Sequence, residues 1–196
     1  MNMNTTARLI GLTGPAGCGK STIAQAIVLH ENDLCYWKDA ARHRFAGPLK
    51  AMLRTLGLTE AQVDGDQKET PCELLGGKTP RAAMQLLGTD WGRNMIGPDL
   101  WVRATMLRVD ADLAEGKLVV IDDVRFDNEV TAIHERGGIV VKLVRDTHEP
   151  LLAQYRAAQH ASEAGVSPHL VDVIVPNQDA PDAVARFILN QLVQGD

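Results

Sequence analysis

A phosphate-binding loop motif lies near the start of the chain. Residues 14–21 meet every fixed position of the pattern G-x-x-x-x-G-K-[ST] and read Gly14-Pro15-Ala16-Gly17-Cys18-Gly19-Lys20-Ser21. Glycines let the backbone curl so that successive N–H groups face a phosphate, and a following helix adds the partial positive charge of its N-terminus. Lys20 would reach the β- and γ-phosphates, and Ser21 would ligate Mg²⁺. The motif predicts a nucleotide-binding protein.

Two carboxylates and an arginine follow an apolar run at residues 117–121. Asp122 and Asp123 come directly after the run, where a second acidic group of a phosphate-loop enzyme meets Mg²⁺ or its waters. Arg125 comes two residues later, and its planar fork suits an acceptor phosphate. The alternatives are a solvated turn and a surface ion pair. For Arg42, Arg44 and Lys50, the surface ion pair is the stronger alternative to a phosphate contact.

A second group of candidates falls between residues 77 and 93. Arg81 and Arg93 would bind phosphate, Gln85 would bind a base edge, and Trp91 would stack on the base. Thr79 followed by Pro80 is a typical helix start, which would place residues 81 and 85 on one helical face. The alternative is that the tryptophan belongs to a core and the arginines are solvated.

A third group lies between residues 145 and 168, after an apolar run. Arg145 and Arg156 would close over a triphosphate as parts of a lid, neutralising charge and excluding water. His160 fits a hydrogen-bonding lid residue better than a catalytic base.

The elements needed to position these residues form an alternating pattern of strands and helices. Apolar, β-branched runs predict parallel strands at 8–13, 117–121, 138–144 and 170–175, and a weaker strand lies between Cys35 and Phe45, at 35–37 or 42–45. Helices are expected at 21–28, 99–115, 128–136 and 181–193. This alternation predicts an α/β fold with a mostly parallel five-stranded sheet between two helical layers, and with the phosphate loop at a carboxyl end of the sheet.

Composition limits the class of protein. The 196 residues suit one α/β domain, and 45% hydrophobic with 23% charged residues is ordinary for a soluble globular protein. A net charge of −5 and a pI near 5.7 disfavour a protein that coats nucleic acid. The three cysteines form no metal-binding or C-x-x-C spacing, which favours a reducing compartment. With no signal-peptide pattern and no apolar run of about 18 residues, we expect a cytoplasmic protein without a membrane partner.

Several segments together resemble the deoxynucleoside monophosphate kinases of tailed phages and prophages. Besides the phosphate loop, they are Phe45-Ala46-Gly47-Pro48-Leu49-Lys50, Lys78-Thr79-Pro80-Arg81 running on to Gln85, Leu87-Gly88-Thr89-Asp90-Trp91-Gly92-Arg93, Asp99-Leu100-Trp101, Asp123-Val124-Arg125-Phe126-Asp127-Asn128-Glu129 and His160-Ala161-Ser162-Glu163. The match spans nearly the whole chain. The segments at 78–93 and 123–129 are the distinctive ones, and Gly47 departs from the acidic residue expected before Pro48.

The resemblance implies a P-loop NTPase fold of the nucleoside-monophosphate-kinase type. It implies transfer of the γ-phosphate of ATP, with Mg²⁺, to a deoxynucleoside 5′-monophosphate. The implied single domain has a core at 1–46, 99–145 and 169–196, an acceptor-binding insertion at about 47–98 and a lid at about 146–168.

Each site residue then receives an expected role. The expected catalytic residues are Lys20, Arg125, Arg145 and Arg156. The ATP site comprises Gly14, Ala16, Gly17, Cys18, Gly19, Lys20, Ser21, Thr22 and Asn177, with Asn177 near the adenine. The acceptor site comprises Lys50, Arg81, Gln85, Trp91, Arg93 and Arg125, and the metal ligands are Ser21 and Asp123.

Two other functions stay open on the sequence alone. One is a kinase for another phosphorylated small molecule, such as dephospho-coenzyme A, and the other is a nonenzymatic nucleotide-dependent switch. A GTPase would show D-x-x-G and N-K-x-D, but the corresponding segments read Asp122-Asp123-Val124-Arg125 and Pro176-Asn177-Gln178-Asp179. The base preference is not readable, and a homodimer stays open.

Overall fold

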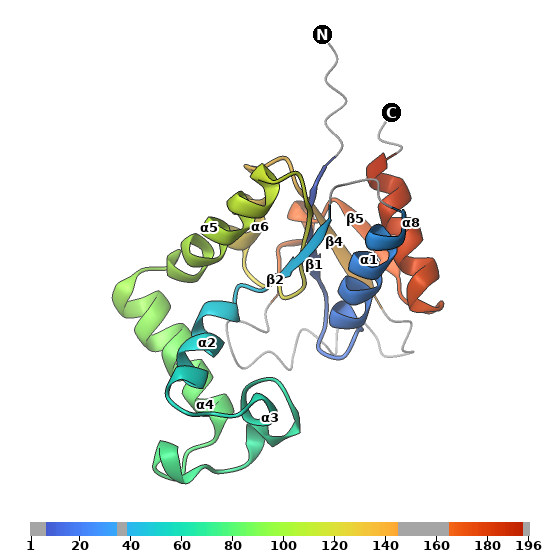
Figure 1. The fold of residues 1–196 in the computed structure, drawn as a ribbon. Coiled ribbons are helices and arrows are strands. Elements are labelled where there is room, and N and C mark those ends of the chain that lie inside the picture. Colours follow the sequence, from blue (N-terminus) through green and yellow to red (C-terminus); the bar gives the residue numbers. More distant parts are fainter. Residues whose placement is uncertain (1–6, 35–38, 145–164, 194–196) are drawn as a thin grey trace. The chain divides into compact units, whose positions relative to one another are not determined.

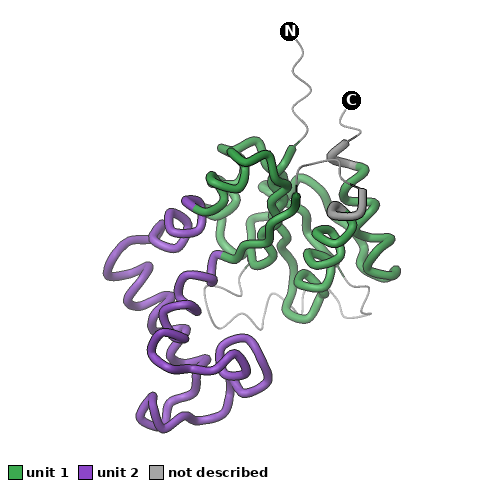
Figure 2. Tube along the Cα trace, viewed as in Figure 1, with its two compact units in different colours: residues 1–44, 108–196 green, residues 45–107 purple. Residues whose placement is uncertain are grey.

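The chain forms two compact units, shown in green and purple in Figure 2. The computed structural model describes residues 7–34, 39–144 and 165–193. Unit 1 comprises residues 1–44 and 108–196, and unit 2 comprises residues 45–107. Each unit has its own hydrophobic core.

Unit 1 is built on a parallel sheet of five strands (Figure 1). The strands are β1 (Leu9–Thr13), β2 (Ala40–His43), β3 (Leu118–Ile121), β4 (Ile139–Val144) and β5 (Val173–Pro176), in the order β2-β3-β1-β4-β5. All four pairings between neighbours are parallel, for example Ile10 with Val120 and Ile10 with Ile139. The predicted α/β fold is confirmed. The weak strand lies at 40–43, which overlaps the second of its two expected positions, and residues 35–37 lie outside the described ranges.

The strands alternate their side chains between two helical layers. On one face, Ile10 and Leu12 of β1 join a core with Ile23 and Ile27 of α1 (Lys20–Leu34) and with α8 (Pro181–Val193). On the other face, a Cβ at Gly11 would lie 2.6 Å from Ile133 of α6 (Asp127–His134), so a glycine lets this helix pack closely. Burial of both faces explains why β1 and β3 are continuous apolar runs.

Helix α5 (Leu100–Ala114) runs through the boundary between the units, which falls after Leu107. In unit 1 its last turns lie beside α6, because Arg136 donates to both carboxylate oxygens of Asp110, at 2.6 and 3.0 Å. His43 of β2 also contacts Asp112 at 2.6 Å, from Nε2 to Oδ2. A short 3₁₀ helix, η5 (Pro168–Leu170), precedes β5.

Unit 2 consists of short helices around a small core. The elements are α2 (Gly47–Thr55), α3 (Glu60–Val63), η1 (Asp66–Glu69), η2 (Glu73–Leu75), α4 (Pro80–Gln85), the π-helix η3 (Leu86–Ile96) and the first half of α5. Its buried core residues are Leu49, Leu53, Leu58, Val63 and Trp101. The predicted cap of α4 is present: the Thr79 side chain accepts a hydrogen bond from the Ala82 N–H at 3.2 Å. Within the described ranges, the helices are too short or too polar to cross a membrane.

Candidate active site

The phosphate loop joins β1 to α1 and has the backbone that the motif predicts. Gly14, Gly17 and Gly19 have φ values of 138°, 74° and 92°, in a region that other residues rarely adopt. Lys20 folds back onto the loop, and its Nζ donates to the carbonyl oxygens of Gly14 at 2.8 Å and Pro15 at 2.7 Å. These two hydrogen bonds hold the lysine ammonium at the loop.

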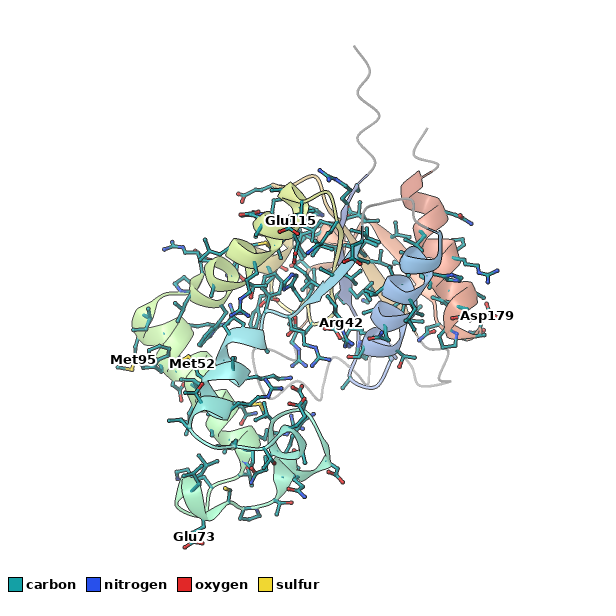
Figure 3. All side chains as sticks on the ribbon, viewed as in Figure 1. Arg42, Met52, Glu73, Met95, Glu115 and Asp179 are labelled. Atoms are coloured by element: carbon teal, nitrogen blue, oxygen red, sulfur yellow. The ribbon has the colours of Figure 1, made fainter. Side chains whose placement is uncertain are left out.

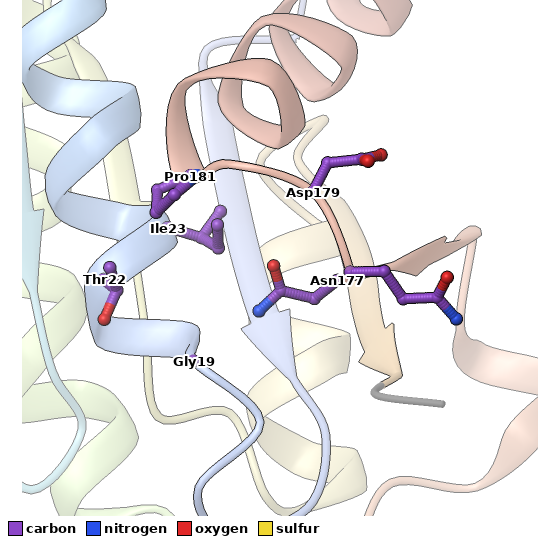
Figure 4. Close-up of a pocket in the computed structure, with 7 residues that line it drawn as sticks. Gly19, Thr22, Ile23, Asn177, Asp179 and Pro181 are labelled. Carbon is purple, nitrogen blue, oxygen red and sulfur yellow. The ribbon is translucent and has the colours of Figure 1, made fainter. Parts of the chain in front are cut away.

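A pocket lies between the phosphate loop and the segment that joins β5 to α8. It has a volume of about 330 Å³, and Figure 4 shows Gly19, Thr22 and Ile23 from the loop and α1, with Asn177, Asp179 and Pro181 from the segment that leads into α8. The nearly buried Asn177 donates from Nδ2 to the Cys18 carbonyl at 2.6 Å. A Cβ at Gly19 would lie 2.4 Å from that Nδ2, so only glycine leaves room for the amide. The contact fixes the loop against β5.

The motif serine meets a carboxylate at the carboxyl end of β3. Ser21 Oγ donates to Asp122 Oδ2 at 2.7 Å. Two arginines from β2 and the residue after it share the same carboxylate: Arg42 pairs with Oδ2, and Arg44 Nε donates to Oδ1 at 3.0 Å. Burial alone would raise the pKa of Asp122, but the hydrogen bonds from Ser21 and Arg42, together with the two guanidinium charges, hold that pKa below its usual range.

Asp122 is thus the carboxylate that contacts Ser21, one residue before the predicted ligand Asp123. Asp123 is half-buried, and its role as a ligand stays a prediction. Arg42 and Arg44 were weaker candidates for a phosphate contact in the sequence. The R-x-R pattern at a strand end does not show which carboxylate the two arginines pair with. The one signal in the sequence was the alternation of side chains along a strand, which places residues 42 and 44 on the same face.

Arg125 is exposed at the start of α6, and its backbone is fixed. Glu129 Oε2 accepts hydrogen bonds from the N–H groups of Arg125 at 2.7 Å and Phe126 at 3.2 Å. Because the Glu129 side chain is buried, it holds this turn rigidly while the Arg125 side chain faces solvent.

Unit 2 carries the predicted acceptor residues other than Arg125. Arg81 is exposed and pairs with Glu69, while Gln85 is exposed at the end of α4. Trp91 and Arg93 lie on the π-helix, and the Trp91 ring packs at a 48° tilt on Trp101, with 6.1 Å between centroids.

Arg93 and Lys50, two further predicted acceptor residues, each contact a group within unit 2. Arg93 NH1 donates to the Pro98 carbonyl at 3.2 Å, and Lys50 pairs with Asp64. The predicted lid residues Arg145, Arg156 and His160 lie outside the described residues. The core of unit 2 includes Trp101 but not Trp91, which is 38% exposed.

The sequence matches a known protein family. Residues 76–187, over half of the chain, match the family described as deoxynucleotide monophosphate kinase. The chain belongs to this family. A protein of Acanthamoeba polyphaga mimivirus, described as a candidate deoxynucleotide monophosphate kinase, is 34% identical over 163 residues, which are 71% of this chain and 78% of the viral protein. The recognised family and the enzyme class, a nucleoside monophosphate kinase, are confirmed.

Solved structures confirm the fold of the kinase. An APS kinase of Mycobacterium tuberculosis has a TM-score of 0.51 at 16% identity, over 96% of this chain and 98% of that one. A sugar kinase of Janibacter sp. HTCC2649 has a TM-score of 0.52 at 12% identity, over 96% of both chains. At such identities the likeness concerns the P-loop kinase fold alone.

Proposed function

We propose that the kinase transfers the γ-phosphate of ATP, with Mg²⁺, to a deoxynucleoside 5′-monophosphate. The observation that carries the proposal is the contact between Ser21 and Asp122 at the mouth of a complete phosphate loop. It brings together the hydroxyl and the carboxylate that phosphate-loop enzymes use around their metal. Family membership supports a nucleotide as the substrate.

We expect the base of the donor nucleotide and its phosphates to bind at two adjoining parts of unit 1. The pocket lined by Gly19, Asn177 and Pro181 supports the prediction that Asn177 lies near the adenine. From there the phosphates would lie along the loop toward Lys20 and Ser21. To bind them, the Lys20 ammonium exchanges its two carbonyl acceptors for phosphate oxygens, which attract it more strongly because they are charged.

The residues beside the loop fit a magnesium ion. Mg²⁺ prefers hard oxygen ligands, and Ser21 Oγ with the carboxylate of Asp122 supplies both, 2.7 Å apart. Asp123, the ligand expected from the sequence, is the next carboxylate along the chain. When bound, Mg²⁺ would neutralise charge on the β- and γ-phosphates.

Unit 2 is proposed to bind the acceptor. The exposed side chains of Arg81 and Gln85 offer a phosphate ligand and a base-edge partner, and the partly exposed ring of Trp91 offers a stacking surface. Lys50, Arg93 and Arg125 complete the proposed acceptor set, and Arg145 with Arg156 are proposed to close over the triphosphate. The cysteine pattern favours a reducing compartment, so we place the reaction in the cytoplasm.

A substrate panel tests the proposal. The protein is mixed with ATP, Mg²⁺ and each of the four deoxynucleoside monophosphates, the ribonucleotides or dephospho-coenzyme A, and ADP formation is measured. We expect turnover with at least one deoxynucleotide. ADP formation with dephospho-coenzyme A alone would assign the other kinase, and no ADP above background with any deoxynucleotide would refute the proposal.

Two lysine variants show whether turnover belongs to this site. Lys20→Ala removes a positive charge from the phosphates, and loss of one such electrostatic contact slows transfer by about 10²–10³-fold. Lys117→Ala is the matched control, because this lysine pairs with Asp112 and Glu115 at the end of α5. Circular dichroism is the check that both variants fold. Unchanged turnover in Lys20→Ala would show that the activity arises elsewhere.

A further inference from the structure

Two arginines, Arg42 and Arg44, lie at the carboxyl end of β2 and pair with Asp122. Residues 42 and 44 are two apart along an extended chain, so their side chains share one face, whereas His43 between them faces the other side and meets Asp112. Figure 3 shows Arg42 at the end of its strand. Both guanidinium groups reach the carboxylate of Asp122.

The guanidinium group of Arg42 is incompletely hydrogen-bonded. Its terminal NH2 group pairs with Asp122, but its Nε is buried and has no hydrogen-bond partner. A buried N–H without an acceptor is unfavourable, so this position of the guanidinium is not its best-bonded one. An anion that draws the Arg42 guanidinium away from Asp122 could also accept a hydrogen bond from Nε.

Sheet order places this pair on the side of the loop opposite the base pocket. The loop follows β1, the pocket at Asn177 follows β5, and the strands run in the order β2-β3-β1-β4-β5. A nucleotide with its base at Asn177 and its phosphates at Lys20 and Ser21 therefore ends toward β3 and β2. The two arginines that pair with Asp122 lie in that direction, at the end of β2.

We propose that Arg42 and Arg44 bind the phosphate of the acceptor monophosphate. Both arginines pair with Asp122, the carboxylate that we propose for the metal-bound donor. Once the donor occupies Ser21 and Asp122, the two guanidinium groups lose that partner and take phosphate oxygens instead. An arginine fork pairs two such oxygens at once. The inference rests on the proposed function, since it needs a phosphorylated acceptor.

Calorimetry with the full chain tests the pair. Binding of deoxythymidine 5′-monophosphate, or of the best acceptor from the panel, is measured with a nonhydrolysable ATP analogue and Mg²⁺ present. We expect Arg42→Ala and Arg44→Ala each to weaken monophosphate binding at least tenfold and to change the affinity for the analogue by less than threefold. Arg42→Lys and Arg44→Lys keep the charge and should recover part of the loss. Arg108→Ala, an exposed arginine of α5, is the matched control.

Steady-state kinetics separate the outcomes. The same variants should raise KM for the monophosphate and leave KM for ATP nearly unchanged. Unchanged monophosphate affinity would overturn the inference, and so would an equal loss of both ligands with a lowered melting temperature, which would mean a structural role. If the alanine variants do not fold, the lysine variants decide by the same comparison. A wild-type protein that phosphorylates no monophosphate would refute the proposed function itself and this inference with it.

Discussion

At the residue scale, the phosphate loop is held in its binding shape by contacts within unit 1. Lys20 bonds two loop carbonyls, and Asn177 from the other end of the chain bonds a third, that of Cys18. These contacts fix the loop before any phosphate arrives, which lowers the conformational cost of binding. The tight approach of the Asn177 amide to Gly19 is the most restrictive of them, because there is no room for a Cβ.

Replacing Gly19 by alanine should therefore destabilise the nucleotide-free protein. The backbone at this position has φ 92°, which costs about 1–2 kcal/mol for other residues, and the new Cβ would lie 2.4 Å from Asn177 Nδ2. Together these effects should lower the free energy of unfolding by about 2–4 kcal/mol. Urea denaturation measures the change.

Gly137→Ala is the matched control for Gly19→Ala. Gly137 has φ 68° and no atom within 4 Å of an added Cβ, so it carries the backbone strain without the contact. Equal losses at the two positions would show that the amide contact is unimportant. In the double variant with Asn177→Ala, the clash is removed, and part of the stability lost in Gly19→Ala should return.

The sequence predicted the loop residues better than their partners. A motif with fixed spacing identifies Lys20 and Ser21 because the chemistry needs them at fixed positions along one chain segment. The choice between Asp122 and Asp123 depends on which of two successive side chains faces the loop at the end of β3. That choice depends on register against β1 and β2, which lies outside any local pattern.

At the element scale, the C-terminal end of α5 is tied to α6 by the pair of Asp110 and Arg136. The hydrogen bonds from Arg136 hold the pKa of Asp110 below its ordinary value of 3.8, against a smaller effect of burial. A carboxyl whose pKa is lower in the folded protein stabilises the fold above its unfolded pKa, and this contribution disappears as the pH falls through the folded value.

Asp110→Asn should thus lower stability at neutral pH and have less effect in acid. The pair is partly exposed, so we expect a loss of about 0.5–1 kcal/mol at pH 7. The difference between variant and wild type should shrink as the pH falls below 3.8, and melting temperatures at pH 7, 5 and 3 follow it. Glu73→Gln, which removes a charge from unit 2, is the control. A difference that stays constant down to pH 3 would contradict the ionic origin.

The π-helix of unit 2 depends on a close approach between Gly92 and Trp101. A Cβ at position 92 would lie 2.5–2.6 Å from three atoms of the buried indole, whose Nε1 donates to the Gly88 carbonyl at 2.8 Å. Gly92→Ala should lower the free energy of unfolding by about 1–3 kcal/mol, because the ring cannot move without losing that bond. Tryptophan fluorescence during urea unfolding reports the change.

Gly88→Ala is the matched control on the same helix. Its added Cβ would lie 3.4 Å from Leu49 Cδ2, an ordinary contact, so stability should change by less than about 1 kcal/mol. A loss at position 88 as large as that at position 92 would mean that the indole contact is not the cause.

Strands and helices with a clear hydrophobic pattern could be predicted from the sequence, and those without one could not. The four strands other than β2 were predicted from their β-branched and aliphatic runs, which in β1 and β3 reflect burial on both faces of the sheet. Strand β2 was ambiguous, since Ala-Ala-Arg-His is only half-buried and contains two residues that serve the site or its ion pairs. The π-helix was not predicted, because its wide turns depend on the packing of Gly92 against Trp101 rather than on a local periodicity.

At the scale of the whole molecule, two units with separate cores divide the tasks that we propose. The donor elements, with Lys20, Ser21 and Asn177, belong to unit 1, and the proposed base-binding residues of the acceptor belong to unit 2. The expected division into core, insertion and lid stays a prediction. In both units aliphatic residues form most of the core.

Hydrogen exchange of the full chain should report the two ligands separately. A nonhydrolysable ATP analogue at a hundredfold excess over its Kd stabilises the state that binds it by about 2.7 kcal/mol. It should slow exchange at residues 14–22 and 177–181, which belong to the phosphate loop and to the segment across the pocket from it, where we propose that the donor binds. Adding the deoxynucleoside monophosphate should then slow exchange at residues 81–93. The corresponding deoxynucleoside, which lacks the phosphate, is the control and should have a weaker effect. If the monophosphate slows no amide between residues 45 and 107, unit 2 does not bind the acceptor, and the base must be recognised by residues of unit 1.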